Sequence, residues 1–267
     1  DAHRKEFKPL KDNVGLFVVD EAHYIGKATE NFRKVYKNID DIIDFFGNPL
    51  TLGVTATLAN EVSDPVIDTL DIKSTVIDDT IRDNMKMVDL RNKYAEDEKI
   101  KYLDRLVQND EKSIIYLNSR HGTFELAQEL KRRNPDWEDK IAFFHSEVDD
   151  EDKKTIAEKF LEGEYKFMIA TSAFGEGINN EDVRHVVLYH MNFNWTSFNQ
   201  MCGRVGRDGE TAWIHLLYNQ RDVDRNRFIL ENRNPSRNSL ATIYKALYQM
   251  PKSKLKRKKA VETLSNN

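Results

Sequence analysis

Two adjacent carboxylates, Asp20 and Glu21, follow a short apolar run in the stretch FVVDEAH. An aspartate at the end of a buried strand can hold Mg²⁺ through water, and a neighbouring glutamate can orient or deprotonate the water that attacks a γ-phosphate. His23 can couple this pair to a second element, because Thr55 and Thr57 of TAT close the next apolar run. Taken alone, an acidic turn and a threonine-rich turn are the simpler explanations of these residues.

The nearby Gly26-Lys27 pair is not a phosphate loop. Such a loop has the pattern G-x-x-x-x-G-K-[ST] between a strand and a helix. Here Glu21 stands where the first glycine is needed, Ala28 stands where the hydroxyl is needed, and no second Gly-Lys occurs in the sequence. We therefore expect the phosphate loop to lie upstream of residue 1, and this chain alone to be inactive toward ATP.

Arginines in a glycine-rich turn form the second reactive pattern. Arg204 and Arg207 stand in QMCGRVGRDG, where Gln200 lies one helical turn ahead of Arg204. Guanidinium groups are always charged and forked, and so suit a γ-phosphate that is bound by a facing domain. A basic surface turn is the weaker alternative because the pattern is long and specific.

A third stretch, ATSAFGEGIN, follows the apolar run FMIA. Gly175 and Gly177 would let the backbone approach a phosphate closely. Thr171, at the end of the run, is a natural donor to nucleic-acid phosphates.

The elements that position these residues alternate between strands and helices. This alternation predicts an α/β fold, a parallel sheet with helices on both faces. We expect strands at 14–19, 49–57, 85–91, 113–119, 140–146, 166–172, 184–190 and 212–218. We expect helices at 31–46, 95–109, 121–133, 149–163, 195–203, 222–232 and 238–249, and a domain boundary near 75–85.

The composition narrows the class of protein. The 267 residues are 39% hydrophobic and 32% charged with a net charge of −4, which predicts a globular chain whose total charge does not announce nucleic-acid binding. A single cysteine excludes a disulfide framework and a zinc site built on several cysteines, and suits a cytoplasmic location. No run is long and apolar enough to predict a membrane span. The lysine-rich stretch 252–259 is best explained as a solvated tail, with nucleic-acid contact as the minority interpretation.

In order and spacing, VVDEAH, VTAT, SIIYLNSR, ATSAFGEGIN and QMCGRVGRDG resemble the motifs of the superfamily-two helicase core. They are most similar to the RecQ-like DNA helicases, over roughly residues 14–220. The resemblance implies three parts: a partial RecA-like domain at 1–78, a complete three-layer RecA-like domain of the P-loop NTPase type at 79–220, and a helical, basic extension at 221–267. In this family two such domains clamp ATP between them, and hydrolysis moves single-stranded DNA across them.

The resemblance also implies roles, position by position. Hydrolysis would rest on Asp20, Glu21, Arg204 and Arg207, with Asp20 and Glu21 holding Mg²⁺ through water. ATP binding and coupling would use His23, Thr55, Thr57, Gly175, Gly177, Asn179 and Gln200. Contacts to the nucleic-acid strand would come from Asn118, Ser119, Arg120, His145, Ser146 and Thr171.

Two departures from the family pattern affect the expected cofactors and partners. The aromatic-rich loop after DEAH keeps only Tyr24, Phe32, Arg33 and Tyr36, and the tail lacks the four cysteines of the family's zinc subdomain. The expected cofactors are therefore ATP and Mg²⁺ without zinc, and the expected partner is single-stranded or partly duplex DNA. An attached nuclease or other DNA-processing module is a further partner that this branch allows. The alternatives are an RNA helicase of the same superfamily and a non-catalytic nucleic-acid-binding module.

Overall fold

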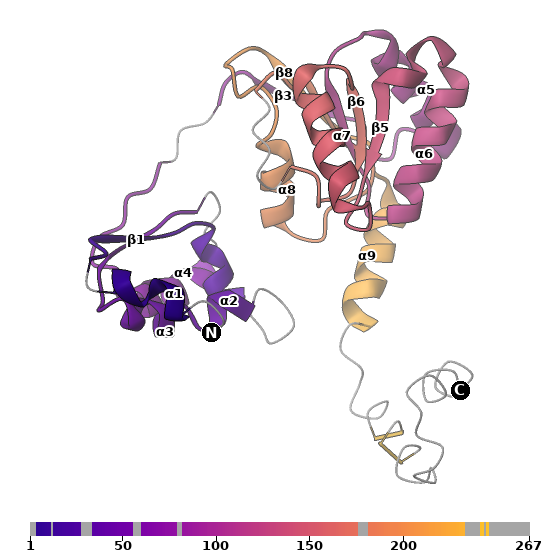
Figure 1. The fold of residues 1–267 in the computed structure, drawn as a ribbon. Coiled ribbons are helices and arrows are strands. Elements are labelled where there is room, and N and C mark those ends of the chain that lie inside the picture. The colour runs from indigo at the N-terminus through magenta and orange to yellow at the C-terminus, as the bar shows by residue number, and fades with distance from the viewer. Residues whose placement is uncertain are drawn as a thin grey trace, which may run out of the picture.

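The computed structural model describes residues 4–11, 13–27, 34–55, 60–78, 82–175, 181–232, 241–242 and 244–245. These residues form two parallel sheets, one of two strands and one of six (Figure 1). Thr57, Gly177 and Asn179, the stretch 252–259 and most of the expected helix 238–249 lie outside the described residues.

The N-terminal unit is built on strands β1 (Leu16–Val19) and β2 (Leu50–Gly53), which pair in parallel. Val19 points into a small core that helices α3 (Ile39–Phe45) and α4 (Asn60–Leu70) complete through Ile43 and Leu70. The other helical elements of the unit are short. They are α1 (Arg4–Phe7), η1 (Lys8–Leu10), η2 (Ala22–Lys27) and α2 (Lys34–Lys37).

The opposite face of this small sheet is apolar and exposed. Leu16, Val18, Leu50 and Leu52 alternate with the inward-facing residues and are 51%, 53%, 74% and 48% exposed. A strand whose two faces are both apolar is typical of a parallel sheet with helices on both sides. The sequence of these strands is therefore suited to a second covering layer.

The C-terminal unit is a six-stranded parallel sheet with the order β3-β8-β7-β4-β6-β5. Its strands are β3 (Met85–Asp89), β4 (Ser113–Tyr116), β5 (Ile141–Phe144), β6 (Phe167–Ala170), β7 (His185–Leu188) and β8 (Ala212–Leu216). Its helices are α5 (Glu96–Gln108), α6 (Arg120–Arg133), the 3₁₀ helix η3 (Pro135–Lys140), α7 (Asp150–Glu162), α8 (Trp195–Cys202) and α9 (Gln220–Asn232).

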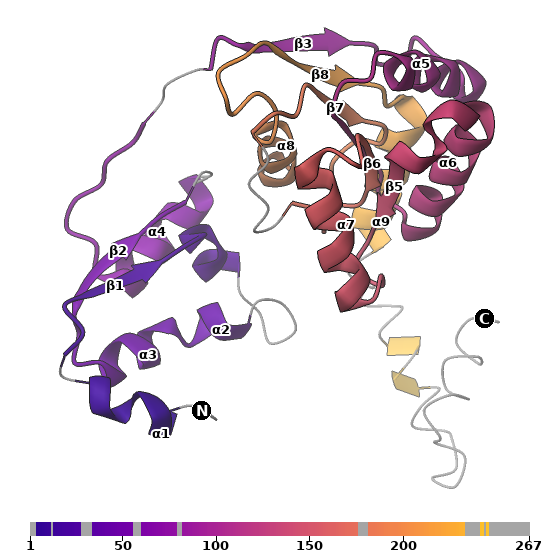
Figure 2. The same cartoon turned by 45° about the horizontal axis from the view of Figure 1, so that its top comes forward.

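Alternate side chains of the central strands feed two separate cores, because side chains along a strand point to opposite faces. Ile114 and Val186 pack with Phe160 of α7 and Met201 of α8. On the other face, Ile115, Val187 and Ile169 pack with Leu103 of α5 and Leu130 of α6. Figure 2 shows these two helix pairs on opposite faces of the sheet.

The expected strands and helices of this unit are confirmed, with ends that differ by a few residues. One expectation for the N-terminal unit is wrong, and one helix of the unit was not predicted. The single helix expected at 31–46 is two helices, α2 and α3, with a break at Asn38, whose backbone is not helical at φ −114° and ψ 29°. Helix α4 was not predicted, because residues 58–79 show few strong periodic signals. Pro65 lies inside this helix, although proline normally interrupts a helix.

None of the helices in the described part of the chain has the length and apolar composition that a bilayer crossing requires. The longest of these helices, α6, has 14 residues and ends in Lys131, Arg132 and Arg133.

Candidate functional site

The acidic pair lies directly after β1, where the strand turns. Asp20 Oδ1 accepts a hydrogen bond of 2.8 Å from the Glu21 N–H. Glu21 has a left-handed backbone with φ +48°, which is uncommon for a residue other than glycine. Its side chain is 37% exposed, while its Oε2 atom, which faces His23, is buried.

His23 joins this turn to the turn after β2. Its Nδ1 lies 2.8 Å from Thr55 Oγ1 and 3.1 Å from Glu21 Oε2, and its side chain is only 1% exposed. The two turns are also joined by backbone hydrogen bonds, from the Ala22 N–H to Val54 O and from the Val54 N–H to Val19 O. The structure thus brings together Glu21, His23 and Thr55 from two neighbouring strand ends.

Two of the aromatic residues that follow the acidic pair contact it or its neighbours. Tyr36 donates its hydroxyl proton to Asp20 O over 3.0 Å. The Tyr24 ring lies 5.6 Å from the Tyr36 ring and 4.2 Å from the His23 ring. Phe32 and Arg33 lie outside the described residues.

The donors of this turn fit hydrated Mg²⁺ bound to a nucleotide. Carboxylate oxygens are preferred Mg²⁺ ligands, and the ion usually keeps several waters and substrate phosphates as its other ligands. Asp20 and Glu21 supply two carboxylates. The described part of the chain contains no cluster of three or more histidine, cysteine, aspartate or glutamate side chains that could bind a metal ion. A site completed by water and phosphate is therefore the kind that these residues can form.

The second pattern forms a turn between α8 and β8, residues 203–209, which we call the arginine loop. Arg204 donates from Nη1 to Gly175 O, and Arg207 donates from Nε to Gly203 O over 3.2 Å. Burial, followed by the charges of Arg204 and Arg82, lowers the pKa of the Arg207 guanidinium. Gln200 lies on the last turn of α8.

Gly175 is fitted to Arg204. It has φ +104°, and a Cβ at this position would collide with the Arg204 guanidinium. We therefore expect Gly175→Ala to lower the free energy of unfolding by about 1–3 kcal/mol and also to displace Arg204. Urea denaturation measures the first effect.

Gly163→Ala is the matched control, because Gly163 has φ +81° but nothing lies within 4 Å of an added Cβ. Both variants should lose stability, but only Gly175→Ala should also slow ATP turnover in a polypeptide that includes the phosphate loop. Equal turnover in the two variants would contradict the fit between Gly175 and Arg204.

The residues expected to contact nucleic acid lie together at another edge. Strands β4, β6 and β5 are adjacent and parallel, so their carboxyl ends meet at one edge of the sheet. The residues that follow these three ends are Asn118, Ser119 and Arg120 after β4, Thr171 after β6, and His145 and Ser146 after β5. The arginine loop is bonded to two segments, because Arg204 donates to Gly175 O, which follows β6, and the Gly206 N–H donates to Val183 O, which precedes β7.

Several of these edge residues also have structural partners. Ser119 caps α6, because its Oγ accepts a 3.1 Å hydrogen bond from the Gly122 N–H. Arg120 forms an ion pair with Glu147, and both side chains are more than half exposed. His145 Nδ1 accepts from the Glu147 N–H over 3.3 Å. Asn118, Arg120 and Ser146 are the exposed members of the group.

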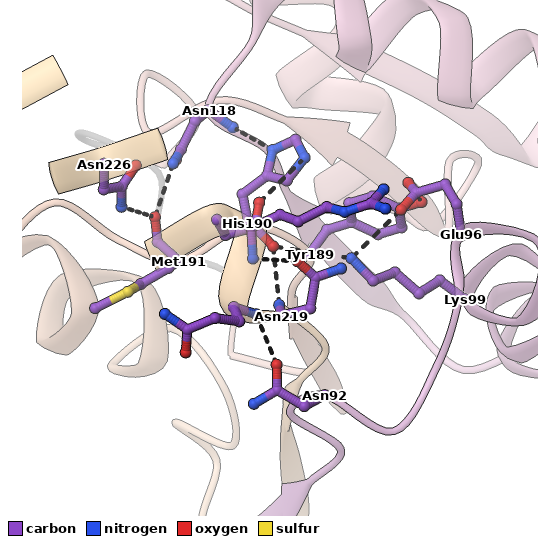
Figure 3. A network of polar contacts seen from close by, with 12 residues as sticks. Asn92, Glu96, Lys99, Asn118, Tyr189, His190, Met191, Asn219 and Asn226 are labelled. Atoms are coloured by element: carbon purple, nitrogen blue, oxygen red, sulfur yellow. Dashed lines mark hydrogen bonds and ion pairs between the residues drawn. The ribbon is translucent and has the colours of Figure 1, made fainter. Parts of the chain in front are cut away.

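Asn118 holds the loop that follows β7 (Figure 3). Its side-chain amide donates to Met191 O over 2.7 Å, and its backbone N–H donates to His190 Nδ1 over 3.2 Å. Asn226 of α9 donates to the same Met191 oxygen over 2.9 Å. The edge is thus fixed by α9 as well as by the strands.

Lys99 is a buried residue that the sequence analysis did not single out. Its side chain is 2% exposed and its Nζ lies 3.5 Å from Glu96, 3.9 Å from Asp222 and 4.8 Å from the centre of the Tyr189 ring (Figure 3). A buried ammonium requires such partners. The signal was present, because Lys99 occupies a position on the apolar face of α5, beside Leu103 and Leu106.

Two protein-family models match the chain. The Helicase conserved C-terminal domain matches residues 98–209, and the Type III restriction enzyme, res subunit, matches residues 1–60. The ATP-dependent DNA helicase RecQ of Bacillus subtilis is 31% identical over 223 residues, which are 82% of this chain and 36% of RecQ. The chain belongs to the RecQ-like helicases of superfamily two.

Two further relatives are also named as ATP-dependent helicases. The probable ATP-dependent DNA helicase RecS of Bacillus subtilis is 29% identical over 88% of this chain and 47% of its own length. A putative ATP-dependent RNA helicase of Acanthamoeba polyphaga mimivirus is 29% identical over 84% of this chain and 40% of its own length. The RecQ-like chain thus spans less than half the length of these relatives.

Solved structures show that the fold is RecA-like. Saccharomyces cerevisiae Dbp5 bound to RNA and ADP BeF3 has a TM-score of 0.66 at 18% identity, over 82% of this chain and 57% of Dbp5. Mycobacterium smegmatis helicase Lhr bound to single-stranded DNA and AMP-PNP has a TM-score of 0.65 at 18% identity, over 82% of this chain and 31% of Lhr. The fold class expected from the sequence is confirmed.

Proposed function

We propose that this chain is part of an ATP-dependent DNA helicase and contains the hydrolysis carboxylates of one RecA-like domain and the whole of a second. Residues 1–78 would belong to the first domain, 79–220 would form the second, and 221–267 would be a helical, basic extension. Asp20, Glu21, Arg204 and Arg207 would act in hydrolysis. The observation that carries the proposal is the cluster of Glu21, His23 and Thr55, in which Thr55 Oγ1 lies 2.8 Å from the His23 imidazole.

Bound ATP with Mg²⁺ would supply the phosphoryl group that passes to water. Asp20 would hold the ion through water, and Glu21 would orient or deprotonate the attacking water. When the two domains close, Arg204 and Arg207 would be brought to the γ-phosphate. Their positive charges would stabilise the negative charge of the transition state there. His23 would transmit the state of the acidic turn to the turn that contains Thr55 and Thr57.

The exposed apolar face of β1 and β2 supports the view that more of the first domain belongs to the functional protein. Leu50 is 74% exposed on this face, and monomeric proteins seldom leave contiguous apolar surface uncovered. The relatives that are two to three times longer than the matched region have room for the remaining strands and for a phosphate loop.

Single-stranded DNA is the proposed partner, bound along the carboxyl ends of β4, β6 and β5. Arg120 would exchange Glu147 for a phosphate at little cost, because exposed ion pairs contribute only about 0–1 kcal/mol. We also propose a cytoplasmic location, which the single cysteine suits, and an attached nuclease or other DNA-processing module as a further partner. RNA is the second candidate substrate, because one relative is named as an RNA helicase.

Binding of fluorescent oligo(dT) and oligo(U) to this chain at two salt concentrations tests the partner. We expect oligo(dT) to bind more tightly, with log affinity falling against log salt by about 0.7 per phosphate contacted. Arg120→Ala should reduce that slope by about 0.7, one contact. Arg132→Ala is the matched control, since Arg132 lies at the far end of the same helix and pairs with Glu129.

The outcome that favours RNA is tighter, equally salt-dependent binding of oligo(U). Affinity that does not change with salt, or with Arg120→Ala, would contradict binding at the proposed edge.

A further inference from the structure

Two residues just before β3 bind the arginine loop through its backbone. Arg82 donates from Nη1 to Val205 O over 3.0 Å. Asn84 donates from Nδ2 to Gly206 O over 2.7 Å and to Glu210 O over 2.8 Å. The backbone contributes as well, because the Ala212 N–H donates to Asn84 O over 3.0 Å. Two side chains that lie more than a hundred positions earlier in the chain therefore bind the backbone in the middle of the loop.

The fit between Asn84 and the loop is close. Gly206 has φ +53°, and a Cβ added there would lie 2.6 Å from Asn84 Nδ2. An asparagine amide nitrogen carries two N–H donors, and here each can serve one of two carbonyl groups. An aspartate of the same shape has no donor for either of them.

Two of these hydrogen bonds reach backbone oxygens that lie between the two arginines in the chain. Val205, whose carbonyl oxygen Arg82 binds, is the neighbour of Arg204, and Gly206 is the neighbour of Arg207. The Arg82 charge is also near enough to lower the pKa of Arg207, after burial and Arg204. Arg82 thus adds both a hydrogen bond and positive potential at the loop.

The same two residues lie at the end of the segment that joins the two units. Helix α4 packs against the 3₁₀ helix η2, which contains His23. Residues 72–78 then follow without helix or strand, and Val76 and Ile77 are 93% and 80% exposed. Arg82 and Asn84 come shortly after these residues, where the chain is hydrogen-bonded to the six-stranded unit. A short stretch of chain thus links the unit of the acidic pair to the arginine loop.

We propose that Arg82 and Asn84 are positioning residues for Arg204 and Arg207. Through Arg82 and Asn84, the joining segment determines the position of the arginine loop when the two units move. This inference rests on the proposed role of the arginine loop in ATP hydrolysis. It adds a route, along the joining segment and through the hydrogen bonds of Arg82 and Asn84, by which the state of one unit reaches the arginines of the other.

The test uses Asn84→Ala, Asn84→Asp, Arg82→Ala and Arg82→Lys in a polypeptide that joins this chain to its phosphate loop. Misplaced catalytic groups slow reactions by up to about 100-fold, so we expect kcat to fall by roughly 10- to 100-fold in the two alanine variants and in Asn84→Asp, with KM for ATP nearly unchanged. Arg82→Lys keeps a charge and a donor and should restore most of the rate.

Lys86→Ala is the matched control, because Lys86 also donates to a backbone oxygen, Asp83 O, but within its own segment. A second readout needs no ATP. Hydrogen exchange in this chain should rise within 203–212 for Asn84→Ala and Arg82→Ala, and should stay unchanged for Lys86→Ala. Faster exchange throughout the six-stranded sheet would show a general loss of stability and would overturn a positioning role.

Arg207→Ala, measured in parallel, separates the two proposals. Normal turnover in Arg207→Ala would overturn the proposed function itself. Loss of turnover in Arg207→Ala, with wild-type kcat in Asn84→Ala and Arg82→Ala, would overturn only the inference about the positioning residues.

Discussion

Arg207→Ala, in a polypeptide that includes the phosphate loop, is expected to lower DNA-stimulated ATP turnover by about 10³- to 10⁵-fold. A guanidinium that meets the γ-phosphate only in the transition state contributes to kcat and little to ground-state binding. The affinity for a fluorescent ATP analogue should therefore stay close to that of the unaltered protein. Steady-state turnover with and without single-stranded DNA measures the effect.

Arg105→Ala serves as its control, because Arg105 is an exposed arginine on α5 in the same unit. It should leave both turnover and binding unchanged. Near-normal turnover in Arg207→Ala would refute its assignment to the γ-phosphate. An equal loss of ATP binding would mean that Arg207 acts in the ground state.

Glu21→Gln is expected to have the second largest effect, a fall in turnover of about 10²- to 10⁴-fold. Glutamine keeps the shape of the side chain but cannot take a proton from water. Binding of Mg²⁺ and ATP should persist, because Asp20 is left in place. Single-turnover hydrolysis, with nucleotide binding measured separately, distinguishes the two effects.

Asp68→Asn is the control for charge, since Asp68 is an exposed carboxylate on α4 in the same unit. The melting temperature of Glu21→Gln should also be close to that of the unaltered chain, because the left-handed backbone at Glu21 is kept. A Glu21→Gln variant that hydrolyses ATP at the normal rate would remove Glu21 from the mechanism.

The sheet of the C-terminal unit could be predicted from sequence because its central strands β4, β6 and β7 are buried on both faces. Runs such as SIIY and FMIA are buried at every position, are mostly apolar and are bounded by polar turns. The residues that follow those runs are then brought to one edge by parallel pairing alone. This is why Asn118, Thr171 and His145, far apart in sequence, follow adjacent strand ends.

Helix α4 could not be predicted by the same reasoning. Its Pro65 is a helix-breaking signal, and the helix is stabilised by tertiary packing of Val66 and Leu70 on the small core. Local propensity is a weak guide where such packing decides the structure. Ser119 shows a related difficulty, because a strand-end serine followed by a helix fits both a nucleic-acid contact and the N-cap that the structure contains.

The contacts of Arg82 and Asn84 depend on the folded sheet. β3 pairs with β8, the last strand of the sheet in chain order, which places Asn84 beside Gly206. No local pattern in IRDNMKM indicates this pairing. Lys99, in contrast, could have been found as a charged residue in the apolar stripe of a predicted helix.

ATP turnover by the joined polypeptide, with and without single-stranded DNA, tests the central claim most directly. The claim is that carboxylates of one RecA-like domain and guanidinium groups of the other form one hydrolysis site whose activity depends on a bound strand. We predict slow turnover alone and a large acceleration by single-stranded DNA. Turnover that is indifferent to the strand, or absent in its presence, would contradict it.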